Sequence, residues 1–294
     1  MNILVTGAKG QLGSCISDEK HTEKDNYFFT DVDTLDICDK EATDRYLNDN
    51  KIDVIVNCAA YTDVEKAEEE SEYEKVYRIN SEAVENLALL AAEKNIVLIH
   101  ISTDYVFGGN SNNTPCSETQ PENPTGVYGQ SKLEGEKKIK TSGARAIILR
   151  TAWLYSEYGK NFLKTMLSLM SSREELNVVF DQCGTPTYAR DLAHAIIEII
   201  DNRQFDGNEG VYHFSNEGVC SWYDFAEIIR EYSGIKRCEI KPCYSSDFPS
   251  KVKRPNYSVL DKTKFKKVFG YTIPYWTFSV KECMNNLKKQ SEKK

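Results

Sequence analysis

The sequence predicts an α/β fold in which helices cover both faces of a doubly wound parallel sheet. Two observations predict this class: short β-branched runs alternate with helical patterns through the first half of the chain, and a glycine-rich turn follows the first run. Such alternation is typical of parallel sheets buried on both faces. The pattern changes after about Trp153, so we expect a sheet domain over 1–152, with return elements near 188–216, and a smaller, loop-rich, interleaved part over 153–294.

The elements follow in order from the periodicity of the apolar residues. Buried strands are predicted over 3–6, 27–30, 54–57, 97–102 and 146–150. Helices are predicted between them over 11–20, 40–48, 72–94 and 127–141. Further helices are predicted over 161–171, 191–202 and 221–233, and further short strands over 177–180 and 211–215. Loops are predicted between Pro242 and Trp276, and the lysine-rich tail from Leu287 is expected to be a frayed, solvated end.

Composition limits the classes of function. The chain has 294 residues, of which 40% are hydrophobic, so it can bury a core without a metal or disulfide staple. It carries 37 Lys and Arg against 45 Asp and Glu, a net charge of −8, which excludes a general nucleic-acid-binding surface. No apolar run approaches the ~20 residues of a membrane span, and a strand begins at once, which leaves no room for a signal peptide. We therefore expect a cytoplasmic protein.

The cysteines and histidines indicate neither a disulfide framework nor a metal site. The nine cysteines contain no CxxC pair, and the four histidines are far apart in the sequence. An odd number of scattered cysteines is typical of reduced thiols, and neither residue type shows the spacing of metal ligands. We expect no catalytic metal.

Gly7, Gly10 and Gly13 lie in a segment that follows the first predicted strand and opens the first predicted helix. Glycines at this spacing permit a tight turn, close approach of backbone amides to a pyrophosphate, and close packing of the helix on the sheet. The helix start at Gln11 and Leu12 would offer unpaired N–H groups and a partial positive charge to that anion. The motif predicts a dinucleotide-binding (Rossmann) turn, and a turn that merely needs glycine is the alternative.

Asp31 follows the second predicted strand. A carboxylate at this place can accept hydrogen bonds from the adenosine ribose hydroxyls and would repel a 2′-phosphate. Asp31 therefore favours NADH over NADPH as cofactor, and a solvated carboxylate at a strand end is the alternative. Further candidates for contact with the cofactor are Asp36, Ile37, Ala59, Ala60 and Tyr61.

Tyr128 and Lys132 are four residues apart on a predicted helix, so their side chains share one face. A phenol has a pKa near 10, and a nearby ammonium group would lower it toward the range useful for proton transfer. A packed tyrosine and a solvated lysine are the alternative, but the nucleotide turn upstream favours the catalytic interpretation. Thr103 and Asp104 end the fourth predicted strand, where the Thr103 hydroxyl could polarise a substrate carbonyl.

Seven segments carry a resemblance to a known family. They are GAKGQLG at 7–13, STDYVF at 102–107, YGQSKLEGE at 128–136, RTAWLY at 150–155, NF at 161–162, DQCGTPT at 181–187 and RPNYS at 254–258. In this order the segments resemble the extended short-chain dehydrogenase/reductase family over nearly the whole chain. Within that family they are similar to the enzymes that use NADPH or NADH to reduce the 4-keto group of dTDP-4-dehydro-L-rhamnose. The resemblance implies a dTDP-sugar as the partner and a substrate-binding role for 153–294.

The resemblance also implies roles for single residues. Tyr128 would donate a proton to the nascent alkoxide, and Lys132 would tune Tyr128 and hold the nicotinamide ribose. Thr103 and Asp104 would complete the catalytic set and contact the sugar. Asn80 would support a water-linked proton path, with a plain helix-start residue as the alternative.

Three further residues are implied as substrate contacts. Trp153 would face the sugar, and Asn161 and Arg254 would contact the nucleotide diphosphate. A guanidinium suits phosphate oxygens because its N–H groups form a fork, although a solvated charge run is the alternative for Arg254.

The chain departs from the family pattern at two points. Glu65 stands where the family usually has Asp, which we expect to be a small change near the cofactor. The family is usually NADPH-dependent and tolerant of NADH, whereas Asp31 favours NADH. Some members bind magnesium at a dimer contact, but no ligand spacing supports this here, and either a monomer or a homodimer is expected.

Other functions of the same fold stay open. Dehydratases of the family carry an Asp-Glu pair after the threonine, and here Tyr105 follows Asp104, so dehydration lacks its acid. Another nucleotide-sugar reductase or epimerase is an alternative. A non-catalytic subunit, like the regulatory β-subunit of methionine adenosyltransferase, is another, although the intact catalytic set favours an enzyme.

Overall fold

The computed structural model describes residues 1–19, 24–248, 250–252 and 254–292. Its centre is a six-stranded sheet in the order β10-β5-β4-β3-β1-β2, in which every pair of neighbours is parallel. The strands are β1 (Asn2–Thr6), β2 (Asn26–Phe29), β3 (Val54–Asn57), β4 (Val97–Thr103), β5 (Arg145–Thr151) and β10 (Gly210–His213). The strand order reverses between β1 and β3, where open α/β sheets bind ligands. The predicted fold class is confirmed.

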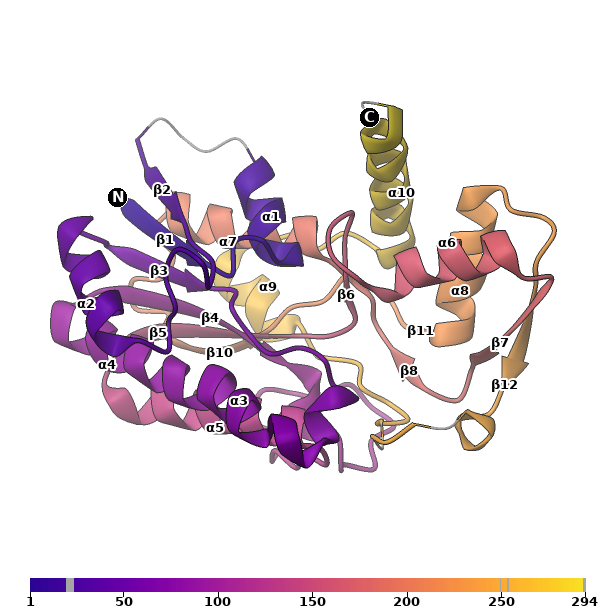
Figure 1. Ribbon diagram of the computed structural model, residues 1–294, viewed down its shortest axis with the longest axis horizontal. Coiled ribbons are helices and arrows are strands. Elements are labelled where there is room, and N and C mark those ends of the chain that lie inside the picture. Colours follow the sequence, from indigo (N-terminus) through magenta and orange to yellow (C-terminus); the bar gives the residue numbers. More distant parts are fainter. Residues whose placement is uncertain (20–23, 249, 253, 293–294) are drawn as a thin grey trace.

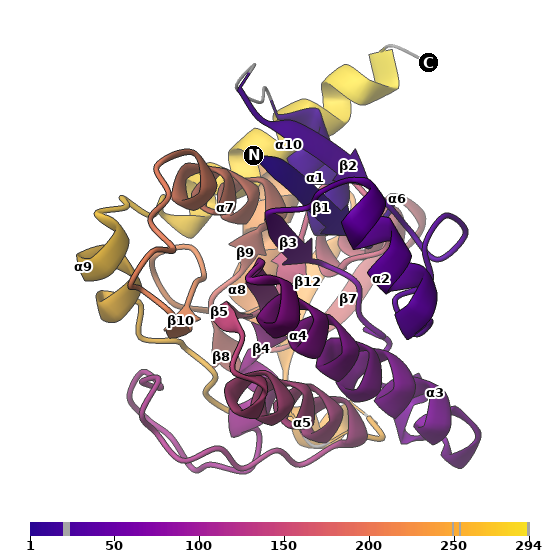
Figure 2. The same cartoon turned by 90° about the vertical axis from the view of Figure 1, so that its left-hand side faces the viewer.

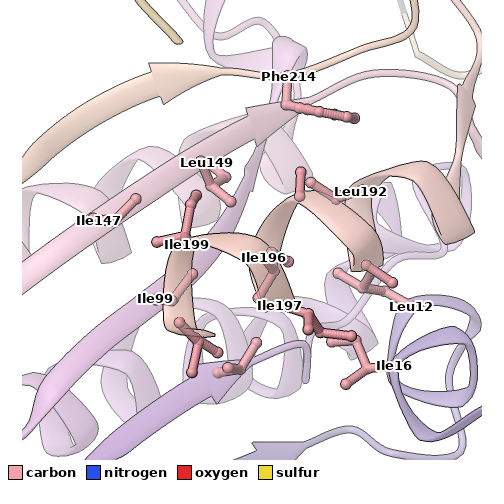
Figure 3. Packing of buried hydrophobic residues seen from close by; sticks show 14 of the residues in the cluster. Leu12, Ile16, Ile99, Ile147, Leu149, Leu192, Ile196, Ile197, Ile199 and Phe214 are labelled. Atoms are coloured by element: carbon pink, nitrogen blue, oxygen red, sulfur yellow. The ribbon is translucent and has the colours of Figure 1, made fainter. Parts of the chain in front are cut away.

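Helices cover both faces of the sheet (Figures 1 and 2). One face carries α1 (Gln11–Asp18), α7 (Ala189–Asp201) and α9 (Thr263–Phe269), and the other carries α2 (Lys40–Asp49), α4 (Ala83–Lys94) and α5 (Val127–Ser142). An apolar core lies between the sheet and the helices on the first of these faces. Figure 3 shows this core, in which Leu192, Ile196 and Ile199 of α7 pack against aliphatic side chains of β4 and β5. Each such buried aliphatic side chain stabilises the fold by about 1.5–3 kcal/mol relative to an exposed one.

Local signals in the sequence explain where several helices begin and end. The Asp39 side chain accepts a hydrogen bond from the Ala42 N–H and so caps α2. Helix α5 ends at Gly143, whose φ of +79° is easily adopted only by glycine.

The predicted helix over 72–94 is divided in the structure. It consists of α3 (Tyr73–Tyr77), a π-helical segment η3 (Arg78–Glu82) and α4. The short 3₁₀ turns η1 (Lys66–Glu68) and η2 (Glu70–Glu72) precede it. A π-helical turn inside a helix frequently marks a functional site, and this one contains Asn80.

The second part of the chain builds its own core beside the sheet. Helices α6 (Phe162–Ser172), α8 (Trp222–Ser233) and α10 (Trp276–Glu292) pack with the parallel pair β7 (Glu175–Val179) and β12 (Glu239–Cys243) around a separate apolar cluster. Two-residue pairs join this part to the sheet region: β6 (Leu154–Tyr155) with β9 (Thr187–Tyr188), and β8 (Cys183–Gly184) with β11 (Cys220–Ser221). The 3₁₀ turns η4 (Asp104–Phe107) and η5 (Ser245–Asp247) complete the element order.

Some predictions for the second half are wrong. The tail from Leu287 is not frayed through Glu292, because it continues α10, where Leu287 packs on the apolar cluster and Gln290 donates to the Tyr158 hydroxyl. Strand β12 was missed because Pro242 breaks its pattern, and α9 lies in the stretch predicted as loops. The predicted helix end at Lys20 and the final Lys293 and Lys294 lie outside the described residues. No helix in the described part of the chain is long and apolar enough to cross a membrane.

Candidate active site

A cavity of about 820 Å³ opens where the strand order reverses. A cavity of this size suits a cofactor. Seven of the residues predicted to contact the cofactor line it, namely Gly7, Gly10, Asp31, Asp36, Ile37, Ala59 and Ala60. They come from the segments that follow β1, β2 and β3, so three strand ends contribute to one site.

The glycine-rich turn is packed so closely that side chains cannot be accommodated. Gly7 has a φ of +63°, and a Cβ there would lie 2.7 Å from the backbone nitrogen of Ala59. A Cβ at Gly13 would lie 2.5 Å from the Gly7 carbonyl oxygen. Gly10 is the N-cap of α1 and has no side chain to compete with an anion for the N–H groups of the first turn. These residues therefore fit a dinucleotide pyrophosphate, whereas Leu12 packs in the core.

Asp31 lines the cavity and also stabilises the glycine-rich turn by hydrogen bonds. One carboxylate oxygen accepts a hydrogen bond from the Lys9 N–H at 2.9 Å, and the other accepts one from the Val32 N–H at 2.9 Å. The side chain of Lys9 pairs with Asp33 at 2.5 Å at the exposed rim. Sequence reasoning missed three basic side chains that line this cavity. Lys9 lies inside the glycine motif but is not one of its glycines, and Lys75 and Arg78 lie outside the motif.

Thr103, Asp104 and Tyr128 come together where β4 ends and α5 begins. The Thr103 hydroxyl donates to the Asp104 carboxylate at 3.1 Å and accepts from the Tyr105 N–H at 3.2 Å. The Thr103 side chain also lies close enough to the Tyr128 phenol to lower the pKa of that phenol. The Tyr105 ring packs edge-on against the Tyr128 ring, with centroids 5.4 Å apart. A hydroxyl and a phenol are thus held side by side at a strand end.

Burial decides the protonation of this group. It raises the pKa of Tyr128 above its ordinary value, and the Thr103 side chain offsets this only in part. It also raises the pKa of Asp104 to about 6, against hydrogen bonds from Ser258 and Thr103 that lower it. The predicted lowering of the Tyr128 pKa by Lys132 is wrong for this structure, because the pKa is raised and Lys132 is not among the groups that shift it. Tyr128 is a neutral phenol, the form that a proton donor requires.

Lys132 is buried on the same helix as Tyr128. Its Nζ donates to the Ile101 carbonyl at 2.6 Å and lies 3.3 Å from Nε2 of His100. Burial lowers the pKa of Lys132 to about 8, although the Glu136 carboxylate favours the ammonium form.

Asn80 fixes a loop that borders the first cavity, which Ala60 lines. Its side chain accepts from the Tyr61 N–H at 2.9 Å and donates to the Tyr61 carbonyl and to the Ser131 hydroxyl, each at 3.1 Å. Its own carbonyl faces α5 so closely that a Cβ at Gly135 would lie 2.4 Å away. Asn80 thus ties the loop at Tyr61 to the helix that carries Tyr128, and the water-linked proton path stays a prediction.

A second cavity of about 580 Å³ lies among α6, β7, α8 and the segment before α9. Phe162, Trp222 and Arg254 line it. Trp153 stacks on Trp222 with ring centroids 3.5 Å apart and has a φ of +48°, a strained conformation typical of functional sites. Arg254 donates to Glu65 at 3.2 Å. Glu65 was predicted to lie near the cofactor, and this is wrong, because its carboxylate accepts from the segment that borders the second cavity.

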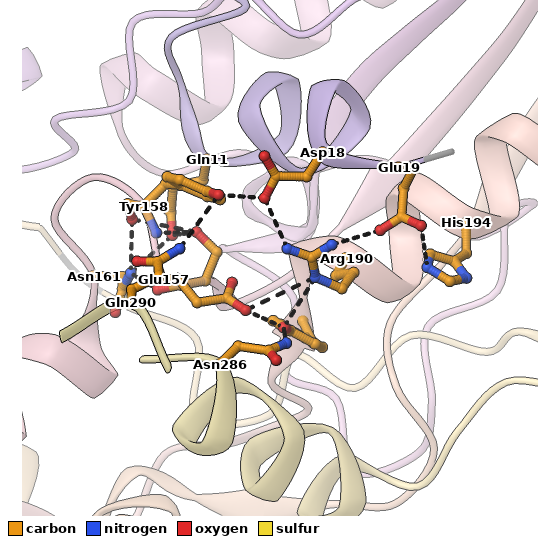
Figure 4. Close-up of polar contacts among 12 residues, drawn as sticks. Gln11, Asp18, Glu19, Glu157, Tyr158, Asn161, Arg190, His194, Asn286 and Gln290 are labelled. Carbon is orange, nitrogen blue, oxygen red and sulfur yellow. Dashed lines mark hydrogen bonds and ion pairs between the residues drawn. The ribbon is translucent and has the colours of Figure 1, made fainter. Parts of the chain in front are cut away.

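Asn161 is directed toward α1 instead of the second cavity (Figure 4). Its amide nitrogen donates to the Gln11 side chain at 2.9 Å and to the Ser156 carbonyl at 2.8 Å, and its oxygen caps α6 by accepting from the Lys164 N–H. The predicted contact with a nucleotide diphosphate has no support in these bonds. Gln11, which opens helix α1, is instead fixed by the segment before α6.

Figure 4 also shows a polar network that holds the two parts of the molecule together. Arg190 of α7 pairs with Asp18 at 3.0 Å and Glu19 at 2.6 Å at the end of α1. Asn286 of α10 donates to the Tyr188 hydroxyl at 3.1 Å. Among the described residues, no group of three or more histidine, cysteine or acidic side chains could hold a metal ion.

A partly buried tyrosine and a buried lysine one turn apart, together with a glycine turn at the switch point of a parallel sheet, are typical of nicotinamide-dependent oxidoreductases. The chain belongs to the family described as the RmlD substrate binding domain, which matches residues 1–289. It is 39% identical to the dTDP-4-dehydrorhamnose reductase of Aggregatibacter actinomycetemcomitans, over 95% of this chain and 97% of that one.

Solved structures agree with this assignment. The dTDP-4-dehydrorhamnose reductase of Clostridium acetobutylicum superposes with a TM-score of 0.92 at 41% identity and covers 98% of this chain and 100% of its own. The enzyme of the same name from Bacillus anthracis, solved in complex with NADP, gives a TM-score of 0.89 at 34% identity and covers 97% of this chain and 99% of its own.

Proposed function

We propose that this protein reduces the 4-keto group of dTDP-4-dehydro-L-rhamnose to give dTDP-L-rhamnose, with NADH or NADPH as the reductant. One observation carries the proposal: the Thr103–Tyr128 pair stands at the end of β4 in a fold that also holds a dinucleotide cradle and a second, aromatic cavity with an arginine. The names of the relatives support the identity of the sugar nucleotide.

The residues divide the chemistry between them. A bound nicotinamide supplies the hydride that reduces the C4 carbonyl. Tyr128, neutral because desolvation raises the pKa of its phenol, donates its phenolic proton to the oxygen that becomes the hydroxyl. The Thr103 hydroxyl lies beside that phenol and would orient the carbonyl oxygen by turning its one proton from Asp104 to that oxygen.

The second cavity suits the nucleotide part of the substrate. Arg254 offers a forked cation to a diphosphate. Glu65, which pairs with Arg254 in this structure, holds the guanidinium in place and would share it with the phosphates. Phe162 and Trp222 offer apolar ring surfaces to a base.

The choice of cofactor depends on Asp31. An Asp31→Ala variant is expected to bind both cofactors more weakly, because the turn at Lys9 loses a hydrogen bond, but NADH by about tenfold more than NADPH. Fluorescence titration with each cofactor measures both affinities. Asp33→Ala, which removes only the exposed partner of Lys9, is the matched control. An equal loss for the two cofactors would show that Asp31 does not discriminate between them.

The proposed activity is tested by following absorbance at 340 nm. The 4-keto sugar nucleotide is generated in place from dTDP-glucose by a dehydratase and an epimerase, and NADH and NADPH are offered in parallel. Oxidation of either cofactor that depends on this protein supports the reductase. If folded protein binds cofactor but oxidises neither, the proposal is wrong, and another nucleotide sugar or a non-catalytic role takes its place.

A further inference from the structure

A row of hydrogen-bonded side chains crosses the sheet from the phosphate-binding turn to Lys132. Thr6, Asn57 and His100 are register partners on β1, β3 and β4 and so lie side by side across the middle strands of the sheet. The Thr6 hydroxyl donates to Asn57 Oδ1 at 2.7 Å, and Asn57 Nδ2 lies 3.0 Å from His100 Nδ1. His100 Nε2 then lies 3.3 Å from Lys132 Nζ. All four side chains are buried.

The backbone fixes the direction of the hydrogen bonds in this row. The Ala59 N–H can only donate, and it donates to Asn57 Oδ1 at 3.2 Å, so the other end of the amide is the NH₂ group. That NH₂ donates to Nδ1 of His100, which must therefore be an acceptor. Burial lowers the pKa of His100 well below its ordinary value, so the ring is neutral and carries its single proton on Nε2.

This tautomer directs an N–H group at Lys132. A neutral amine has a lone pair that can accept from Nε2–H, whereas an ammonium group has only donors. If the ring moved its proton to Nδ1 to suit an ammonium group, two donors would face each other between His100 and Asn57. When Lys132 is protonated, two hydrogen-bond donors therefore face each other somewhere in the row, either between Lys132 and His100 or between His100 and Asn57.

We propose that the Thr6–Asn57–His100 row positions the Lys132 side chain and favours its neutral amine form, with His100 as the positioning residue that contacts it. The inference rests on the proposed function, because it concerns the lysine beside the proton donor Tyr128. It also links the strand that leads into the cofactor turn to the helix that carries the proton donor.

Other titratable groups around Lys132 either favour its ammonium form or are neutral. Glu136, one turn further along α5, favours the ammonium form. The Cys58 thiol, after β3, keeps its proton because burial raises its pKa to about 12. The phenol of Tyr128, on the same helix, is neutral for the same reason. Within the described chain, His100 is therefore the side chain whose hydrogen bond distinguishes the two forms of Lys132.

The tautomer can be measured without any activity. In long-range ¹H–¹⁵N spectra of the labelled protein, His100 is expected in the Nε2–H form from about pH 6 to pH 9. His213 is an internal control: it is also buried, but its Nδ1 faces the Cys116 carbonyl at 3.1 Å, so it must carry the proton on Nδ1. Finding His100 in the Nδ1–H or the cationic form would overturn the proposal.

The functional effect is measured by the pH dependence of turnover. Activity that needs the ammonium form of Lys132 falls as the pH rises through the pKa of that group. In His100→Gln the amide oxygen can accept from the ammonium, so this pKa rises and the alkaline limb moves up by about one pH unit, the size expected for one hydrogen bond to a charged group. His213→Gln should leave the limb in place. If the alkaline limb of the pH profile of turnover does not move in His100→Gln, with the fold intact, the proposal is contradicted.

The two tests separate this inference from the proposed function. The spectra of the unmodified protein report the tautomer whether or not the protein reduces a dTDP-sugar. A failed reductase assay with His100 in the Nε2–H form would contradict the proposed function alone. An active enzyme with His100 in the Nδ1–H form would contradict only the proposal that the row positions Lys132.

Discussion

A Tyr128→Phe variant is expected to keep its fold and its affinity for the nicotinamide cofactor but to lose at least about 10²-fold in turnover, the range of general-acid catalysis. The phenylalanine ring preserves the edge-on contact with Tyr105 and removes only the hydroxyl beside Thr103. The loss therefore measures proton donation and not packing. Turnover is followed at 340 nm and cofactor affinity by fluorescence titration.

A neighbouring tyrosine provides the control. Tyr77 packs in the same small apolar cluster as Tyr128, and its hydroxyl lies 3.4 Å from the Gln130 side chain. Tyr77→Phe removes an exposed hydroxyl and is expected to change turnover by no more than about twofold, since surface substitutions cost little. Near-normal turnover in Tyr128→Phe would remove this residue from the mechanism.

An Arg150→Met variant is expected to lose about 3–5 kcal/mol of unfolding free energy, because it leaves a carboxylate buried without its partner. Arg150 and Glu136 are both fully buried and joined by two hydrogen bonds, at 2.9 Å and 2.6 Å. The same carboxylate accepts from the Ser102 hydroxyl at 2.5 Å, so the pair fixes α5 against β4 and β5. Urea unfolding monitored by fluorescence measures the loss.

The same strand offers a matched control. Arg145 begins β5 and pairs with Asp206 at 2.5 Å, but both side chains are more than a third exposed. Arg145→Met should therefore cost no more than about 1 kcal/mol. The double variant of Arg150→Met with Glu136→Leu should recover much of the loss, because it removes both buried charges. Equal losses at Arg150 and Arg145 would contradict this account.

Local patterns explain why the sheet was predictable. The apolar runs that became β1, β3, β4 and β5 are short, β-branched and bounded by turns, so they define their strands without help from the rest of the chain. The helix that ends at Glu292 was not predictable in this way. Its inner side carries apolar residues only as far as Leu287, and the last turn beyond that residue gains its order from a contact with Tyr158, more than 100 positions away.

The same distinction between local and long-range signals applies to the residues of the candidate site. Tyr128 and Lys132 are found by spacing because one helix carries both, and the glycine turn is found because one segment carries all three glycines. The row through His100 could not be found, since it depends on the register of three strands. Glu65 was misplaced for a related reason: its partner Arg254 is 189 positions away, and only the fold brings the two together.

The order in which the sheet is assembled has a consequence for synthesis on the ribosome. The edge strand β10 and the covering helix α7 come from residues 189–213, after the chain has left the sheet to build β7 and α6. When the first 152 residues emerge, β5 is an unpaired edge and the face that α7 covers is bare, a state that favours aggregation. The sheet region therefore depends on residues made later, and we expect the two parts of the protein to fold as one unit.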